Sequence, residues 1–194
     1  RRIMALVALG RLRARRGDPE ADAALDEALA LAEETATLQR LAPVRAARAE
    51  AAWFRGDRER VRAEATAAYP LAAAKGHAWF LGELAYWRWR VGDLDEAPPG
   101  VAAPFALQIR GAWRAAAEAW RERGCPFEEA RALAEGDDEE EARRALAIFE
   151  RLGARPAAVE DAHDHALALY RRGGRDPQVE RAAADHGLDS PVLR

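Results

Sequence analysis

Three segments of the chain end in the same way, and this repetition limits the possible folds more than any other feature. Each segment is rich in helix-forming residues and closes on a Gly-Asp pair, at Gly17, Gly56 and Gly92. These glycines are 39 and 36 residues apart, which is typical of helix–turn–helix units. Seven residues before them stand the small residues Gly10, Ala49 and Ala85, where two helices can approach closely. The repetition predicts stacked helical hairpins.

The composition predicts the same fold class. Of the 194 residues, 49% are hydrophobic, which is enough for a core, and much of that content is Ala and Leu. Residues branched at Cβ are sparse and never alternate with polar ones, so no strand is predicted. We therefore expect an all-α protein, a superhelix (solenoid) of about five helical hairpins.

The stretch from His77 to Asp93 predicts an enclosed helix at the centre of the stack. At helical spacing, Trp79, Gly82, Tyr86 and Trp89 fall on one side of this helix, and Phe80, Leu84, Trp87 and Val91 fall on another. A helix that is apolar on two sides needs partners on both, so other hairpins are expected to cover it.

A break at Pro98-Pro99-Gly100 divides the chain, because a helix interior cannot accommodate this sequence. We expect N-terminal hairpins over 1–97 and shorter hairpins over 98–194, continuous in one solenoid. Helix ends are predicted in the second part at Gly111, Gly124, Gly136 and Gly153. A final hairpin is expected after Pro156, before a loose tail over 188–194.

The segment from Pro104 to Ala158 resembles a known family. It contains G-x-W-x-x-A-x-x-x-W (Gly111 to Trp120), G-C-P-F-E-x-A (Gly124 to Ala130) and, from Ala145, A-x-x-x-x-x-x-L-G-A. These motifs resemble the end of the tetratricopeptide-like (TPR-like) region in LuxR-type bacterial transcriptional regulators, the ATP-dependent proteins of the maltose-activator kind. Related ATPase-TPR proteins without a DNA-binding domain share this segment. With the N-terminal repeats, the resemblance covers most of residues 1 to 158.

The resemblance implies a regulatory superhelix that follows a nucleotide-binding module and precedes a DNA-binding helix-turn-helix. The chain has no G-x-x-x-x-G-K-[ST] phosphate loop, and after Ala158 it continues into another predicted hairpin. We therefore expect the scaffold and the regulatory context of this family, without its nucleotide chemistry and without a cofactor.

An aromatic and basic surface is the main candidate for binding. Counted back from the repeat glycines, the third residue (Ala14, Trp53, Trp89) and the sixth (Arg11, Glu50, Tyr86) are expected on an inner groove. The predicted ligand-binding residues are Trp53, Trp79, Tyr86, Trp89, Arg15 and Arg90. Such a surface can stack a sugar or hold an extended peptide. The alternative is that these rings only fill the contacts between neighbouring hairpins, because aromatic residues at helical spacing usually belong to the core.

Other polar features have simpler explanations. Asp161, His163, Asp164 and His165 do not place a third metal ligand on one helix face, so a solvated face is the preferred interpretation. Cys125 stands at a helix start, which can lower a thiol pKa, but we prefer a small buried residue at a turn. The acidic run 135–141 is interpreted as a helix start with Asp137 or Asp138 as its cap. The arginines of 11–16 are balanced by the nearby acids Glu20, Asp22, Asp26 and Glu27, so a salt-bridged surface is preferred to a nucleic-acid-binding stripe.

Charge and composition limit the classes of partner that the protein is expected to bind. A formal charge of −3 and a pI near 5.9 give no net attraction to a phosphate backbone, so direct nucleic-acid binding is not expected. No apolar run reaches the roughly 20 residues that span a bilayer, and a single cysteine is compatible with a reducing cytosol. Because the sequence begins at Arg1 inside a predicted helix, we expect a piece of a longer protein.

The sequence therefore predicts a non-catalytic, cytoplasmic sensor or regulatory domain that binds a small effector or a protein partner. The alternative is a TPR-type adaptor or oligomerisation module, in which an uncapped repeat end pairs with another copy. An enzyme is not predicted, because no nucleophile, base and orienting group can be assembled from the sequence.

Overall fold

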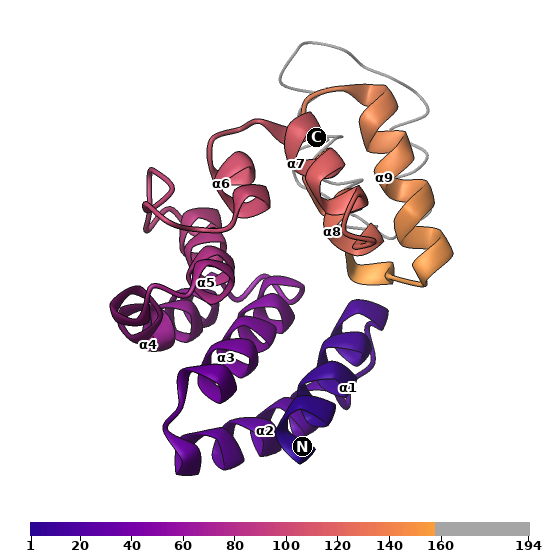
Figure 1. The fold of residues 1–194 in the computed structure, drawn as a ribbon. Coiled ribbons are helices and arrows are strands. Elements are labelled where there is room, and N and C mark those ends of the chain that lie inside the picture. The colour runs from indigo at the N-terminus through magenta and orange to yellow at the C-terminus, as the bar shows by residue number, and fades with distance from the viewer. Residues whose placement is uncertain (158–194) are drawn as a thin grey trace.

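The computed structural model describes residues 1–157, and these residues contain helices but no strand (Figure 1). The all-α class is thus confirmed for this part of the chain. Its helices are α1 (Arg2–Arg16), α2 (Ala21–Thr35), α3 (Leu38–Trp53), α4 (Arg58–Lys75), α5 (Ala78–Arg90), α6 (Ala103–Ile109), α7 (Trp113–Arg121), α8 (Pro126–Ala134) and α9 (Glu139–Leu152). The predicted final hairpin and the tract Asp161 to His165 lie outside the described residues.

Glycines end many of these helices, as the sequence predicts. Gly17, Gly56 and Gly92 have φ angles of 73°, 72° and 75°, which L side chains rarely adopt. Gly136 also follows a helix end, but α8 closes in a right-handed conformation at Glu135 and Gly136 has no positive φ. The helix end at Gly136 is therefore in the predicted place but does not need glycine for its conformation.

The N-terminal helices pack on their neighbours through small residues. α3 contacts both α1 and α2 and has two buried faces that are rich in alanine. Val44, Ala47 and Ala51 join the core formed with α1 and α2, whereas Ala49 and Trp53 join the core that continues through the rest of the chain. The helix α3 therefore connects the first hairpin to the later helices.

The helix α5 is enclosed in its middle, as predicted. It packs against α3 and α4 on one side and against α6 on the other. Leu84, Tyr86 and Trp87 are at most 1% exposed. Gly82 leaves room for the ring of Phe105, because a Cβ atom at this position would lie 2.6 Å from that side chain. Trp79 at the start of α5 departs from this pattern, since 42% of it is exposed.

A non-helical segment separates α5 from α6 and contains the predicted break at Pro98-Pro99-Gly100. The four helices that follow are those expected from the sequence, and three of them are shorter than any helix before the break. One buried cluster includes Trp87 before the break and Phe105 after it. The division at residues 97 and 98 stays a prediction, and the core passes across it.

The helices follow a curved path that brings the C-terminal part of the described chain back toward α1 (Figure 1). An ion pair joins the two ends of this path, with 2.7 Å between Arg15 Nη2 of α1 and Glu128 Oε1 of α8. No helix within residues 1–157 is both long and apolar enough to cross a membrane. The curvature places residues from distant parts of the sequence around a common interior.

Candidate functional site

A cavity of about 40 Å³ lies inside the curve of the helices and widens to about 440 Å³ of empty space when the solvent at its mouth is included. Its walls come from helices on both sides of the Pro98-Pro99-Gly100 break. The described residues that line it are Glu50, Trp53, Phe54, Tyr86, Trp87, Arg90, Phe127, Arg131, Ala134, Glu135, Phe149 and Ala157. Six of these are aromatic, so the cavity combines apolar walls with a few charged groups, as ligand sites commonly do.

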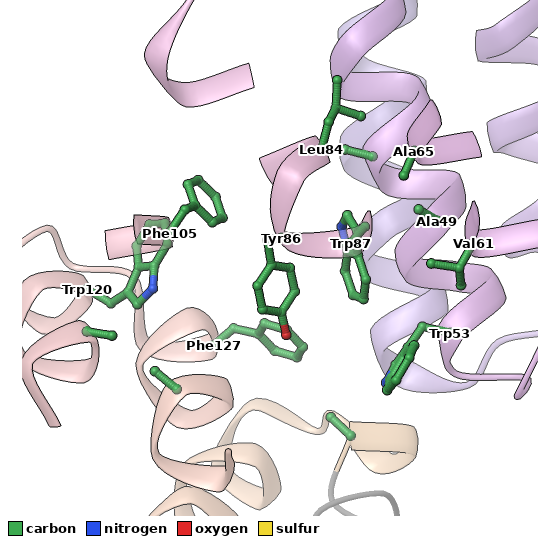
Figure 2. Packing of buried hydrophobic residues seen from close by; sticks show 14 of the residues in the cluster. Ala49, Trp53, Val61, Ala65, Leu84, Tyr86, Trp87, Phe105, Trp120 and Phe127 are labelled. Atoms are coloured by element: carbon green, nitrogen blue, oxygen red, sulfur yellow. The ribbon is translucent and has the colours of Figure 1, made fainter. Parts of the chain in front are cut away.

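The aromatic walls surround Tyr86 at the end of α5. Figure 2 shows Tyr86 with Trp87 on one side, toward α3 and α4, and Phe105 on the other. The rings of Tyr86 and Trp87 pack edge to face at 5.0 Å between centroids, and Trp53 lies 6.1 Å from Trp87. Phe127 in turn packs on Phe149 of α9 at 5.4 Å. These contacts hold the apolar walls in fixed positions.

A buried carboxylate, Glu50 of α3, anchors an ion-pair network beside the cavity. Glu50 is 1% exposed and lies 3.0 Å from Arg11 Nε and 2.6 Å from Arg15 Nε. Arg11 also binds Glu83 of α5 and Arg15 binds Glu128 of α8, both at 2.7 Å. Burial acts to lower the pKa of Arg15, but the charges of Glu50 and Glu128 raise it above its ordinary value. The network therefore ties α1, α3, α5 and α8 together with fixed charges.

A second carboxylate, Glu135, organises the opposite wall. It accepts hydrogen bonds from the hydroxyl of Tyr86, from Arg90 at 2.9 Å and from the amide of Gln108 at 2.9 Å. The Gln108 side-chain oxygen accepts from the indole N–H of Trp120 at 2.9 Å. Burial raises the pKa of Tyr86, with the charge of Glu135 acting in the same direction, so the phenol stays a neutral donor.

Arg131 of α8 completes the charged lining. Its guanidinium group lies over the ring of Tyr86, 4.1 Å from the centroid, and 5.6 Å from that of Trp87. The Nε and Nη2 atoms of Arg131 are buried and have no hydrogen-bond partner in the part of the chain that the structure describes. Native proteins rarely leave buried donors unpaired, which sets Arg131 apart from Glu50, Arg90 and Glu135, the other charged residues among the described residues that line the cavity.

The structure brings together three of the six predicted binding residues. Trp53, Tyr86 and Arg90 line the cavity, and Arg90 also lies over the ring of Trp53, 4.2 Å from its centroid. Arg15 is near the cavity and stacks on Phe127 at 3.6 Å, although its charge is used by Glu50 and Glu128.

Trp79 and Trp89 are not among the described residues that line this cavity. Trp79 is on the outside, 6.0 Å from Trp120 and beneath the guanidinium group of Arg123. Trp89 is half-buried and packs against Trp113 of α7 at 5.9 Å. Trp89 also packs on Tyr86, with 5.9 Å between ring centroids, so it lies behind the cavity wall in a packing role, whereas Trp79 lies on the outside.

Comparison with known proteins found no match. No protein-family model matches the chain, and no curated protein or solved structure is significantly similar to it. The geometry of the cavity is therefore the basis for inferring what the chain does.

Several lining residues were not singled out from the sequence as binding residues. Phe127, Arg131 and Phe149 come from the C-terminal helices, more than 70 residues after Trp53, and Glu135, the first residue of the acidic run, follows the end of α8. Phe127 lies inside the G-C-P-F-E-x-A motif, which was used only for the resemblance. Glu50 was expected on the groove by its register, and it does line the cavity.

The remaining candidates differ in outcome. The acidic run opens α9 as expected, because Asp138 accepts hydrogen bonds from the backbone N–H groups of Glu140 and Glu141. Burial raises the pKa of the Cys125 thiol, the opposite of the lowering considered for a helix start. Within residues 1–157, no group of three His, Cys, Asp or Glu side chains is placed to hold a metal ion.

The arginines of 11–16 pair differently from the expectation. Of the acidic residues expected to balance them, only Glu20 binds one, Arg13. The other acids bind arginines elsewhere, in the pairs Asp22–Arg55, Asp26–Arg48 and Glu27–Arg2. The segment is salt-bridged as expected, but Arg11 and Arg15 are directed into the interior of the curve, where carboxylates from other helices meet them.

Proposed function

We propose that this chain is a non-catalytic regulatory or sensor domain, a TPR-like superhelix that binds a small effector in the cavity inside its curve. The main support for this proposal is that the cavity is lined by residues from both sides of the Pro98-Pro99-Gly100 break. Trp53, Tyr86 and Arg90 come from one side, and Phe127, Arg131 and Phe149 come from the other. A ligand bound there contacts both parts at once.

Such a position gives a route from binding to regulation. In a stack of hairpins that touch mainly their neighbours, the overall curvature depends on small angles between successive units. A ligand that fits one curvature better than another shifts the equilibrium by its difference in affinity for the two. Occupancy of the cavity would then alter the relative positions of the two ends of the domain.

The sequence resemblance supports a regulatory context. The Gly111–Trp120 and Gly124–Ala130 motifs resemble those of LuxR-type regulators, in which the corresponding region lies between a nucleotide-binding module and a DNA-binding domain. We propose that this chain acts in the cytoplasm of a bacterium as such a regulatory region, and that it transmits the bound state to other domains of a longer protein.

A cavity-filling variant tests this proposal. Ala134 lines the cavity, so Ala134→Leu places extra apolar atoms in it. A panel of sugars, organic acids, neutral metabolites and short peptides is titrated against the unaltered protein, followed by tryptophan fluorescence and the midpoint of thermal unfolding. We expect at least one class to shift both signals in the unaltered protein and to lose its effect in Ala134→Leu.

The control is Ala115→Leu, which adds the same atoms at an exposed position of α7. Ala115→Leu should respond as the unaltered protein does. X-ray scattering in solution then measures whether the effective ligand changes the radius of gyration. If no compound acts, or if each active compound is equally effective on Ala134→Leu, the cavity is not the binding site.

A specific feature favours the second candidate, an adaptor or self-association module. The side chains of Met4, Leu9 and Leu12 on α1 are 38%, 41% and 47% exposed. Three large apolar residues on one exposed helix are a surface for another helix. If Leu9→Glu and Leu12→Glu abolish association with a protein partner or a second copy while Ala134→Leu has no effect, the adaptor function is supported instead.

A further inference from the structure

The guanidinium group of Arg131 has hydrogen-bond donors that the described protein does not use. The group stacks on Tyr86, which positions its plane but satisfies none of its N–H bonds. Two of its nitrogen atoms are buried without a partner, and Arg131 makes no ion pair among residues 1–157. A buried donor that is left unpaired weakens the folded state, so an acceptor from outside these residues is expected at Arg131.

The carboxylates around Arg131 are held by other groups. Three other arginines, Arg11, Arg15 and Arg90, bind the four glutamates of this region, which are Glu50, Glu83, Glu128 and Glu135. Arg131 acts on Glu128 at longer range and helps to lower its pKa. The charge of Arg131 therefore acts on the network at a distance, while its Nε and Nη2 atoms, buried in the wall of the cavity, have no acceptor among residues 1–157.

The shape of the cavity defines what can supply the acceptor. Its enclosed volume of about 40 Å³ has room for roughly two or three water-sized groups, which matches a carboxylate, and the empty space of about 440 Å³ that includes the mouth has room for the rest of a ligand. Trp53 and Phe149 present apolar walls for the remainder of a ligand. A guanidinium group binds a carboxylate through two parallel N–H···O hydrogen bonds.

From these observations we infer that the cavity binds a small carboxylic acid, with its carboxylate on Arg131 and its apolar remainder against the aromatic walls. This inference rests on the proposed function and names the class of effector. Arg131 is the residue that selects the charged group. The aromatic rings select the rest of the molecule by contact.

Matched ligands test the inference on the unaltered protein. Benzoate and benzamide have nearly the same shape, but only benzoate carries the carboxylate. We expect benzoate to change tryptophan fluorescence at millimolar concentrations. Benzamide should bind at least about tenfold more weakly than benzoate, because it lacks the charge-assisted pair of hydrogen bonds. A tripeptide with a free C-terminus and its C-terminal amide form a second pair. If the protein prefers the acid to the amide in the tripeptide pair but not in the benzoate pair, the natural ligand is a peptide with a free C-terminal carboxylate.

Matched variants assign the effect to Arg131. Arg131→Lys keeps the charge but loses the fork, and it should weaken benzoate binding by about tenfold. The control is Arg88→Lys, because Arg88 also stacks on a tyrosine, Tyr69, at 4.5 Å and also has a buried Nε without a partner, yet does not line the cavity. Arg88→Lys should bind benzoate as the unaltered protein does.

The outcomes separate this inference from the function on which it depends. Equal binding of acid and amide in both ligand pairs, or unchanged binding of the preferred acid in Arg131→Lys, overturns the carboxylate site. If neutral ligands bind, are blocked by Ala134→Leu and ignore Arg131→Lys, the cavity is a ligand site but its ligand is not an acid. If Ala134→Leu affects no ligand, both proposals fail. Should Arg131→Lys not fold, the two acid and amide pairs still decide the question.

Discussion

Two helix ends in this protein have the same left-handed backbone conformation but different residues, alanine at one and glycine at the other. Ala36 ends α2 with a φ of 50°, a left-handed conformation that costs an L-residue about 1–2 kcal/mol. Gly56 has a φ of 72° after α3, where glycine carries no such cost. No heavy atom lies within 4 Å of a Cβ built on Gly56, so only its backbone conformation would oppose a side chain there.

A reciprocal pair of substitutions measures this preference. Ala36→Gly should raise the free energy of unfolding by about 0.5–1 kcal/mol, because relief of the left-handed strain exceeds the extra entropy of glycine in the unfolded chain. Gly56→Ala should lower it by about 1 kcal/mol for the opposite reason. Chemical denaturation of both variants checks the signs. A loss of stability in Ala36→Gly would show that the methyl group of Ala36 contributes more by packing than it costs in strain.

Pairs of helices approach closely where the sequence has small residues. At Gly10 of α1, an added Cβ would lie 2.5 Å from Cγ and 2.6 Å from Cδ2 of Leu25 in α2, and Leu25 is fully buried. Leu25 cannot move aside without disturbing the core, which interiors packed at crystal-like density resist. The same register position carries alanine in α3 and α5, at Ala49 and Ala85, so the requirement for glycine belongs to the α1–α2 contact.

Gly10→Ala should therefore destabilise the protein although alanine favours helices. The overpacking costs about 1–3 kcal/mol, and the better helix propensity of alanine returns up to about 1 kcal/mol, so we expect a net loss of about 1–2 kcal/mol. Leu25→Ala removes Cγ and Cδ2, the atoms nearest to the new methyl group. In a double-mutant cycle, Gly10→Ala with Leu25→Ala should lose less stability than the two single losses together. If the losses of stability in the two single variants simply add, the cost of Gly10→Ala does not come from its contact with Leu25.

The elements were largely predictable because their ends carry local signals. Gly-Asp pairs and the cap at Asp138 act over a few residues, and the structure has helix ends beside each of them, while the prolines at 98 and 99 lie within the non-helical segment between α5 and α6. The end of α2 at Ala36 carries no such signal, since alanine prefers to continue a helix.

The site could be predicted only in part, because it depends on the curvature of the whole molecule. Local register indicated the inner positions of α3 and α5, including Trp53 and Tyr86. It could not show that α8 returns to the same interior and brings Phe127 and Arg131, since that position results from several small angles between helices. It also could not distinguish the exposed Trp79 from the lining Trp53, because both stand in similarly aromatic segments.

At the scale of the whole molecule, the ion pair between Arg15 and Glu128 closes the curve and should make its stability depend on pH. Burial acts to raise the pKa of Glu128, but Arg15 and Arg131 lower it below the ordinary value of 4.5. A carboxylate whose pKa is depressed in the folded state binds fewer protons there than in the unfolded chain. Its contribution is therefore complete above the unfolded pKa and is lost as the pH falls through the folded one.

The free energy of unfolding should accordingly decrease as the pH is lowered from about 4.5, and Glu128→Gln should remove part of that decrease while lowering stability at neutral pH. Urea denaturation at several pH values measures both effects. Glu118→Gln is the control, since Glu118 pairs with Arg121 in an exposed position on α7 and exposed pairs contribute little. If Glu128→Gln follows the same pH profile as the unaltered protein, the contact between α1 and α8 does not depend on this carboxylate, and the curve is held by its apolar walls alone.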